Sequence, residues 1–597
     1  MAFSFRVDKM NLTDGTVVSA PANGMTVFIG PNNSGKSRLL GEIAGHLASY
    51  PGPAATSQWL SQMEIEAEGT AEDFLQYLHS VGMVPRVRPG SEPAYPLQSR
   101  HVTPMTEMGT PEHMLTACWN SRTYGQIASQ LLSTQWTGDR LQDQTSSSQL
   151  NRLNPPSHPT QYLRTAPSAL AEFSRLIESA FGTPISMNRL DEQGLRLTIG
   201  DPELPADADP ASYEYWDTYR ALPGVADQGD GFRSFINLLL HTLVRPTPVI
   251  VIDEPEAFLH PPQARLLGRI LAERTPSPCQ VFVATHSADF LSGVLEATTK
   301  PVALVRLTRT PAGPRANQLD PEDVASILRT PMLRYSNIIA GLFHDGVVLG
   351  ESAGDCQFYA ATIDALKSDD HPSDNLVFLH TSGKHLLADT AARLRQCGIP
   401  VAVIADLDLL NNKETLKTAL SAAGGDWEKI SADFETLDRN MRDEKTVITA
   451  AAVKRRILEV LGDPKDGTLL TEKQIDEIRG MIKATSSWAN LKKAGLPHLS
   501  GSPAYMATRR IFEALADRGI FAVPVGELEK WVPEVAVRKN RWLTYVFENG
   551  HHLRPSDDLR RFCERITSYL STAPERPAPQ ADSAGNRPQP RGHRPAP

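Results

Sequence analysis

The sequence lacks the features of an exported, disulfide-bonded or membrane-spanning protein. It has only 5 cysteines in 597 residues, far apart and never in a CxxC pair, so reduced thiols are expected rather than a disulfide framework or a zinc ribbon. No stretch reaches about 18 uninterrupted apolar residues, and the N-terminal sequence MAFSFRVDKMNL has no apolar signal-peptide core. We therefore expect a cytoplasmic protein with no membrane span.

A large excess of charge of one sign is also missing. Lys and Arg number 60 against 69 Asp and Glu, a net charge of −9, so nucleic acid could only meet a local basic patch. This balance excludes a histone-like coat protein. The 41% hydrophobic and 22% charged residues are typical of a globular chain, and the length suits roughly three or four domains of about 150 residues.

Apolar runs alternate with helical patterns in two parts of the chain, which predicts two parallel α/β units. We assign residues 1–334 to the first unit and 335–572 to the second. The first contains a segment rich in Pro, Ser, Thr and Gln, which we interpret as a large insertion at about 49–225. The second contains helix-like runs that predict a helical insert at about 411–518. Residues 573–597 include many prolines and no Leu, Ile, Val or Phe, so we predict a disordered tail.

A phosphate-binding loop lies near the N-terminus. The sequence MTVFIGPNNSGKS is an apolar strand, a GxxxxGKS loop and the start of a helix, and this context favours a P-loop over a chance glycine turn. Backbone N–H groups at the helix start would cradle phosphates, Lys36 would contact the outer phosphates, and the Ser37 hydroxyl would hold Mg²⁺. The nucleotide-binding residues expected here are Gly30, Asn32, Asn33, Ser34, Gly35, Lys36 and Ser37.

Two further strands end in polar residues suited to ATP hydrolysis. The run VIVI ends in Asp253 and Glu254, a pattern that matches a metal-binding Asp followed by a water-activating Glu. The run VFVAT is followed by His286. Because this histidine follows a phosphate loop and an Asp-Glu strand end in the chain, we expect it to sense the γ-phosphate. The alternatives are a solvated acidic loop and a structural histidine.

GPNNSGKS, VIVIDEPEAFLHP and VFVATHSADFL together resemble the ABC-type ATPases of the structural-maintenance-of-chromosomes (SMC) and overcoming-lysogenization-defect (OLD) groups. The resemblance implies that ATP is sandwiched between two heads, with a signature loop from the partner. The candidate loop is Asp227–Ser234, in which Gly231 is in place but Gly229 stands where the signature serine would be. No glutamine loop is recognisable in the insertion, and we expect slow hydrolysis that suits a switch.

A second set of carboxylates follows strands of the second unit. Glu351 ends the run GVVLG, and the run VAVIA ends in Asp406 and Asp408, which alternation along an extended chain places on one side. A later strand at 520–523 leads into Gly526 and Glu527. The carboxyl ends of parallel strands share one edge of a sheet, so these groups could hold a divalent cation there. Individually, the DxD could be a solvated turn and Glu351 a helix cap.

The order and spacing of these residues resemble a Toprim domain, and a Toprim domain behind an ABC-type head is the arrangement of OLD-family nucleases. The resemblance implies metal ligands, which we list as Glu351, Asp355, Asp406, Asp408, Glu527 and Glu529, in addition to Ser37 and Asp253 at the ATP site. Glu351 could instead be the acid–base group. OLD nucleases also use a lysine near the scissile phosphate, for which Lys384, Lys530 and Lys539 compete.

The resulting hypothesis is an ATP-binding and ATP-hydrolysing, Mg²⁺-dependent (or Mn²⁺-dependent) DNA endonuclease of the OLD type that acts in bacterial anti-phage defence. It implies a homodimer or larger homo-oligomer through the heads and allows an accessory defence protein. DNA contacts would come from Val537–Trp542, Lys454–Arg456 and Arg509–Arg510, although most such runs are solvated faces. The alternatives are a DNA-binding ATPase clamp or sensor with a non-cutting Toprim domain, and an attack on RNA or free nucleotides.

Overall fold

A computed structural model of the protein divides into two compact units, Met1–His344 and Asp345–Pro597. The division falls at 344, whereas the sequence predicts it at 334. The described residues are 3–52, 57–87, 90, 92–95, 109–142, 144–150, 156–188, 194–205, 208–209, 211–297, 299–310, 313–329, 338–367, 375–381, 384–443, 450–462, 469–483, 487–537 and 539–572. The predicted tail at 573–597 lies outside them.

The first unit is built on a six-stranded sheet of order β14-β13-β3-β12-β11-β7, in which β14 alone is antiparallel to its neighbour. Its strands are β3 (Met25–Ile29), β7 (Leu132–Gln135), β11 (Val249–Asp253), β12 (Gln280–Ala284), β13 (Val302–Thr310) and β14 (Gly313–Leu319). Every residue of β3 and β12 is buried, as continuous apolar runs in a covered parallel sheet should be. The parallel α/β fold class is therefore confirmed for this unit.

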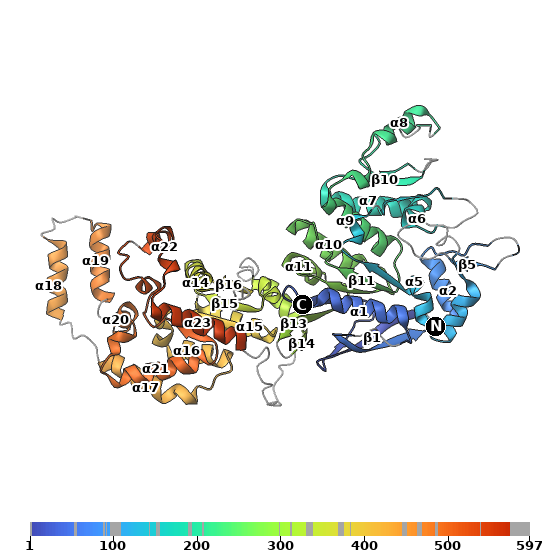
Figure 1. The fold of residues 1–597 in the computed structure, drawn as a ribbon. Helices are drawn as coiled ribbons and strands as arrows, with labels where there is room; N and C mark the ends of the chain where they lie inside the picture. Colours follow the sequence, from blue (N-terminus) through green and yellow to red (C-terminus); the bar gives the residue numbers. More distant parts are fainter. Residues whose placement is uncertain are drawn as a thin grey trace, which may run out of the picture. The chain divides into compact units, whose positions relative to one another are not determined.

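Helix α1 (Lys36–Ser49) lies between this sheet and a second, antiparallel sheet of order β2-β1-β4 (Figure 1). The strands of the second sheet are β1 (Ser4–Leu12), β2 (Val17–Ser19) and β4 (Leu60–Glu68). Phe5, Phe28, Leu39 and Ile43 belong to one buried apolar core that joins α1 to both sheets. The packing fixes the helix that follows the phosphate loop on two sides.

The predicted insertion at 49–225 is too broad. Strand β4 pairs with β1, and strand β7 pairs in parallel with β11, so both belong to the main sheets of the unit. Neither was recognisable as a core strand because LSQMEIEAE and LSTQ are largely polar. The described residues between β7 and α9 (Asp230–Leu239) include a small sheet of β8 (Ser146–Ser147), β9 (Ile185–Met187) and β10 (Leu195–Ile199), and the α-helices α6 (Pro159–Thr165), α7 (Pro167–Phe181) and α8 (Tyr213–Ala221).

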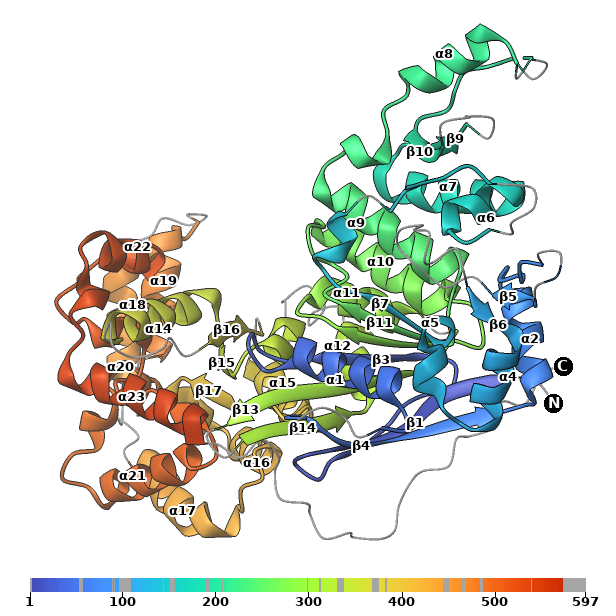
Figure 2. The same ribbon diagram turned by 45° about the vertical axis from the view of Figure 1, so that its right-hand side comes forward.

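The second unit is built on a four-stranded parallel sheet of order β16-β15-β17-β18. Figure 2 labels three of these strands, β15, β16 and β17. Its strands are β15 (Gly346–Gly350), β16 (Leu376–His380), β17 (Val401–Ala405) and β18 (Ile520–Ala522). Alternate residues such as Val348, Ala402 and Ile404 share a core with α14 (Ala353–Leu366) and α23 (Asp557–Thr572). Helix α15 (Lys384–Gln396) also packs on β15 and β17.

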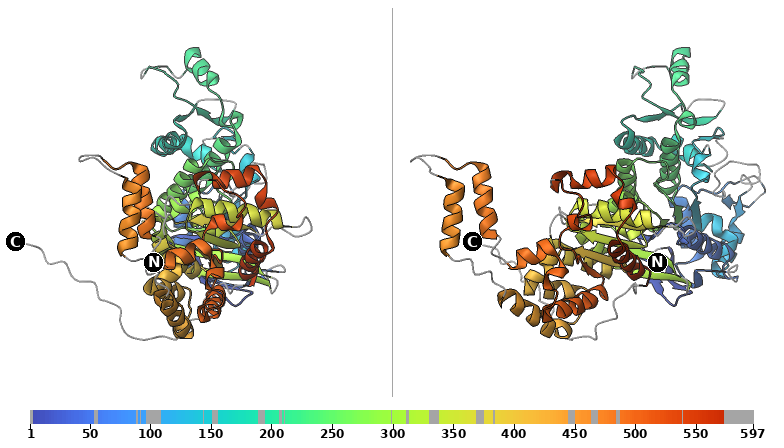
Figure 3. Two further views of the ribbon diagram at one scale, coloured as in Figure 1. Left: turned by 90° about the vertical axis from the view of Figure 1, so that its left-hand side faces the viewer. Right: turned by 60° about the vertical axis from the view of Figure 1, so that its left-hand side comes forward.

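The described residues between β17 and β18 are helical apart from their connections. The helices are α16 (Lys413–Ala422), α17 (Glu428–Asp443), α18 (Ala450–Leu461), α19 (Glu472–Lys483), α20 (Ser487–Ala494) and α21 (Pro503–Ala516), with the short turns η6 (Leu407–Asn411) and η7 (Leu496–Leu499). Helices α18 and α19, drawn in orange, run side by side (Figure 3). The sequence predicts a helical insert over this range, at 411–518.

The five cysteines are all buried and unpaired, as the sequence predicts. Among the described helices, none combines the length and the apolar character needed to cross a membrane.

Helices α10 (Pro261–Arg274) and α11 (Ala288–Glu296) approach closely through two glycines. A Cβ atom on Gly293 would lie 1.9 Å from the Arg265 carbonyl oxygen, and one on Gly268 would lie 2.3 Å from that of Phe290. These neighbours are backbone atoms that cannot move aside cheaply. The two helices can therefore pack at this distance only with glycine at both positions.

We expect Gly293→Ala to lower the thermal melting temperature, because the new methyl group forces apart two packed helices at a cost of about 1–3 kcal/mol. The matched control is Gly45→Ala on α1, where a Cβ meets nothing within 4 Å. That variant should be neutral or more stable, since alanine is the better helix former. Equal melting temperatures for the two variants would contradict the close packing.

Candidate functional site

The loop between β3 and α1 has the geometry of a phosphate cradle. Gly30 and Gly35 have φ angles of 141° and 94°, and Asn33 is also in the left-handed region at 62°. A Cβ on Gly30 would lie 2.1 Å from the Leu307 carbonyl oxygen of β13, so this position must be glycine. The Ser34 hydroxyl is buried with no hydrogen-bond partner in the described part of the chain, and Asn32 is exposed. The backbone turn and the buried hydroxyl fit a bound phosphate.

Lys36 turns back over this loop. Its Nζ donates to the carbonyl oxygens of Gly30 and Pro31 at 2.9 and 2.8 Å. Burial lowers the pKa of the Lys36 ammonium, and the negative charges of Glu254, Glu256 and Asp253 oppose this shift. The lysine is therefore held inside the loop, where phosphate oxygens would compete for its protons.

The two predicted Mg²⁺ ligands of the ATP site are in direct contact. The Ser37 hydroxyl donates to Asp253 Oδ1 at 2.8 Å, which joins the start of α1 to the end of β11. Burial raises the pKa of Asp253, whereas the hydrogen bond from Ser37 lowers it. An alcohol and a carboxylate are oxygen donors of the kind that Mg²⁺ prefers, so this pair fits the ion that accompanies ATP.

Glu254 and His286 meet at the same edge of the sheet. His286 Nδ1 lies 3.4 Å from Glu254 Oε1 and 3.6 Å from Glu256 Oε1. Glu256, which was not among the predicted site residues, is buried and accepts hydrogen bonds from Thr285 Oγ1 and the His286 backbone N–H. Burial raises the pKa of Glu256, and these hydrogen bonds oppose the shift. Glu256 thus anchors the backbone that presents His286.

Arg140 is a buried clamp that the sequence did not reveal. Its guanidinium donates to the carbonyl oxygens of Gln135 and Asp253 at 2.8 Å each, and to that of Glu254 at 2.6 Å. It also donates to Ser234 Oγ of α9 at 3.1 Å. Burial lowers the pKa of Arg140 to about 10, although Glu256, Asp253 and Glu254 oppose the shift. A single arginine in a segment interpreted as part of an insertion gives no signal of this role.

Gln135 ends β7 directly beside Ile252 of β11 and is almost fully buried. The sequence analysis did not single out this residue. Gly229 precedes α9 and Gly231 lies in its first turn, where a Cβ would be 2.4 Å from the Phe258 carbonyl oxygen. The start of α9, in the candidate signature loop, is thus packed against the segment that follows Glu254.

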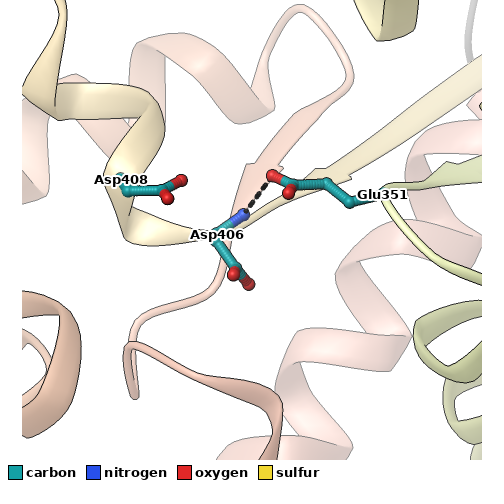
Figure 4. A group of neighbouring side chains, drawn as sticks. All are labelled: Glu351, Asp406 and Asp408. Atoms are coloured by element: carbon teal, nitrogen blue, oxygen red, sulfur yellow. Dashed lines mark hydrogen bonds between the residues drawn. The ribbon is translucent and has the colours of Figure 1, made fainter. Parts of the chain in front are cut away.

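The second site lies at the carboxyl edge of the sheet of the second unit. Glu351 follows β15 and Asp406 follows its parallel neighbour β17, while Asp408 lies in η6. One carboxylate oxygen of each lies within 4.8 Å of those of the other two. The Asp406 backbone N–H donates to Glu351 Oε1 at 3.4 Å (Figure 4). The structure therefore brings these three predicted residues together.

The other predicted carboxylates lie outside this cluster. Asp355 caps α14, where its Oδ2 accepts hydrogen bonds from the Ser352 backbone N–H at 3.0 Å and from the Ser352 hydroxyl at 2.8 Å. Glu527 and Glu529 lie at the start of η8 (Leu528–Trp531). Among the described residues, only Glu351, Asp406 and Asp408 form a group with metal-binding spacing.

A lysine that was not among the candidates contacts this cluster. Lys492 of α20 places its Nζ 3.0 Å from Asp406 Oδ2 and 2.9 Å from Asp408 Oδ2. Burial lowers the pKa of Lys492, but the hydrogen bonds and charges of Asp408 and Asp406 outweigh it and raise the pKa above its usual range. Lys530 lies in η8, and the side chains of Lys384 and Lys539 are outside the described part.

Three carboxylates within metal-ligand spacing, with an ammonium group already held between two of them, form a site that selects cations. The donors are all hard oxygens, which suit Mg²⁺ or Mn²⁺ rather than softer metals. The chemistry of the donor set therefore fits a divalent ion.

The predicted DNA-contact segments differ in whether their side chains are exposed and unpaired. Trp542 is 2% exposed, and the centroid of its ring lies 5.4 Å from that of Phe358. The ring therefore belongs to the core and cannot stack on a base. Arg510 is paired with Asp433, which neutralises its charge. Lys454, Arg455 and Arg456 are exposed on α18. The predicted aromatic contact within Val537–Trp542 is therefore wrong. Trp542 lies on the buried face of helix α22 (Lys539–Glu548), although the helix residues that precede it are polar or basic.

The two sites define a chain in which a P-loop ATPase domain is followed by a parallel α/β domain with a Toprim-like acidic edge. Two family models match. Residues 137–292 match "AAA domain, putative AbiEii toxin, Type IV TA system". Residues 342–408, which include Glu351, Asp406 and Asp408, match "Overcoming lysogenization defect protein-like, TOPRIM domain". The predicted combination of an ABC-type ATPase domain with an OLD-like Toprim domain is confirmed.

Among known proteins, the chain is 25% identical over 170 residues to the Old nuclease of Escherichia phage P2, a match that covers 28% of each chain. It is 32% identical over 73 residues to the uncharacterised protein MJECL11 of Methanocaldococcus jannaschii, over 12% of this chain and 64% of that one. The matches span less than two thirds of either relative. The chain is thus a distant relative of the P2 Old nuclease.

Solved structures that match part of the chain include an SMC head bound to the C-winged helix domain of ScpA. The identity is 14% and the TM-score 0.31, over 53% of this chain and 99% of that one. The SMC head domain from Thermotoga maritima is 15% identical with a TM-score of 0.26, and the match covers 54% of this chain and 100% of that one. The ATP-binding cassette of an ABC transporter in its ADP conformation is 12% identical with a TM-score of 0.24, and the match covers 56% of this chain and 98% of that one.

We expect Asp406→Asn to weaken Mn²⁺ binding by at least about tenfold, because it replaces a charged ligand by a neutral amide. The loss can be measured from the free Mn²⁺ signal in electron paramagnetic resonance. Asp558→Asn on α23 is the control, since it removes the same charge from an exposed helix position. If both variants kept the affinity of the wild-type protein, the ion would have to bind elsewhere.

Proposed function

We propose that the protein is an ATP-controlled, divalent-metal-dependent DNA endonuclease of the OLD type that acts in defence against phage. The observation that carries the proposal is the cluster of Glu351, Asp406 and Asp408 at the shared edge of β15 and β17. The match of this region to an OLD-like Toprim domain, and the distant match to a phage nuclease, support it. The role in defence rests on the family resemblance.

In the second unit, Asp406 and Asp408 would hold a divalent ion, with Glu351 as a third ligand or as the acid–base group. When bound, the ion makes water nucleophilic near neutral pH and neutralises the scissile phosphate. The parallel pairing of β15 and β17 keeps the three carboxylates at fixed positions before a substrate arrives. Asp355, Glu527 and Glu529 remain candidates for a second ion.

In the first unit, the P-loop and Lys36 would hold the phosphates of ATP, while Ser37 and Asp253 hold its Mg²⁺. Glu254, which contacts His286, would orient and deprotonate the attacking water. His286 would sense the γ-phosphate, and the signature segment that contains Gly231 would meet nucleotide on a second copy of the chain. The protein would therefore act as a homodimer or larger homo-oligomer through its heads.

A second candidate function is a DNA-binding ATPase clamp or sensor whose Toprim domain does not cut. The observation that favours it is the ion pair of Lys492 with Asp406 and Asp408, since a carboxylate pair neutralised by a lysine can be structural. The two functions differ in whether substitution of Glu351 removes an activity.

The test is incubation with supercoiled and linear plasmid and Mg²⁺ or Mn²⁺, with and without ATP. We expect Glu351→Ala to reduce cutting by at least about 100-fold, because metal-assisted catalysis is worth several kcal/mol. ATP hydrolysis should be retained in this variant. Lys36→Ala should abolish ATP binding and remove the ATP dependence of cutting, whichever its sign. The products are resolved on agarose gels, and hydrolysis is followed by phosphate release.

Asp558→Asn serves as the control that keeps the fold and the cutting. Absence of cutting by the wild-type protein on every DNA substrate, with ATP still hydrolysed, would favour the clamp or sensor. Cutting of RNA or of free nucleotides alone would keep the nuclease chemistry and change the substrate class.

A further inference from the structure

Lys492 stands out because it connects the helical segment between β17 and β18 to the acidic edge of the sheet. It lies 84 residues beyond Asp408 in the chain, yet its ammonium is within 3.0 Å of both Asp406 and Asp408. Three carboxylates within 4.8 Å of one another repel unless a cation lies among them. Lys492 supplies that positive charge from within the chain.

The backbone at Lys492 is fixed by close packing. A Cβ on Gly526 would lie 1.9 Å from the Lys492 carbonyl oxygen, so this glycine allows the loop after β18 to touch the end of α20. The Leu496 backbone N–H donates to the Pro524 carbonyl oxygen at 2.7 Å, and Leu491 is buried. The main chain of Lys492 is thus braced, and its four-carbon stem is the part that can move.

The ammonium and a divalent ion would use the same two carboxylates. Asp406 Oδ2 and Asp408 Oδ2 each accept from Lys492, and both residues belong to the metal-binding group. A divalent ion carries twice the charge of the ammonium and would compete with it for these oxygens. Because the lysine backbone is braced, the displaced amine would stay near the site and return when the ion leaves.

We propose that Lys492 is a built-in counter-ion that competes with the divalent metal for Asp406 and Asp408 and so sets the metal concentration at which the site fills. This inference rests on the proposed metal site but not on nuclease activity. It gives the helical segment a role at the acidic edge: it keeps the carboxylates close together while no metal is bound and raises the threshold for loading.

The first test measures Mn²⁺ affinity by electron paramagnetic resonance and calorimetry. Lys492→Met keeps the length of the stem and removes the charge, so we expect Mn²⁺ to bind about tenfold more tightly, which is about 1.4 kcal/mol. Lys492→Arg keeps a competing cation and should stay near the wild-type affinity. Lys429→Met on α17 is the matched control, because it removes one positive charge from an exposed position of the same unit. Circular dichroism and melting temperature show whether each variant is folded.

Unchanged or weaker Mn²⁺ binding in a folded Lys492→Met variant would overturn the proposal, since weaker binding would mean that the lysine positions the ligands. If the proposed metal site itself were wrong, the Mn²⁺ affinity would instead be the same for the wild-type protein and Asp406→Asn.

A second test needs no variant. If metal displaces the ammonium, the Lys492 amine of the wild-type protein should react faster with an amine-directed acylating reagent when Mn²⁺ saturates the site. Mass spectrometry of the Lys492 peptide measures the change relative to peptides with exposed lysines such as Lys413 and Lys530. A rate that stays constant or falls with Mn²⁺ would refute displacement even if Lys492→Met did not fold.

Discussion

Parallel pairing of buried strands is the constraint on which both sites depend. In each unit, apolar strands must be covered on both faces, so polar side chains can collect only where the strands end. At the edge of the first sheet, this gathers the phosphate loop after β3, Asp253 and Glu254 after β11, and His286 after β12. In the second sheet, it gathers Glu351 after β15 and Asp406 after β17.

Carboxylates that lie together at a sheet edge repel one another. In each unit, a buried or half-buried cation from another part of the chain reduces this repulsion. Arg140 lies at the ends of β7 and β11, where it donates hydrogen bonds to carbonyl oxygens and interacts with the charges of Glu256, Asp253, Glu254 and Asp139. Lys492 lies against Asp406 and Asp408. Arg140 is locked by several hydrogen bonds to backbone, whereas Lys492 holds the cluster by its flexible stem alone. The first is suited to a permanent support and the second to an exchangeable one.

The strand-end motifs could be predicted because they are local. GPNNSGKS, the Asp253–Glu254 pair and the DxD of Asp406 and Asp408 each follow a continuous apolar run, and such runs are readable without knowledge of the fold. Strands β4 and β7 could not be identified in this way. Their sequences are polar on one or both faces, and they therefore fall within the predicted insertion at 49–225. Trp542 shows the opposite error, since an aromatic among basic residues suggested a nucleic-acid contact but its ring is buried.

The sequence by itself determined the order of the two α/β units, the phosphate loop, the acidic strand ends and the resemblance to an ABC-type head followed by a Toprim domain. Only the tertiary structure decided that Gln135 stands beside β11, that Arg140 joins β7, β11 and α9, and that Lys492 meets the acidic cluster. The physical reason is sequence distance. A strand and the loop after it are encoded by neighbouring residues, whereas a charge that neutralises them from 84 residues away along the chain is fixed by packing alone.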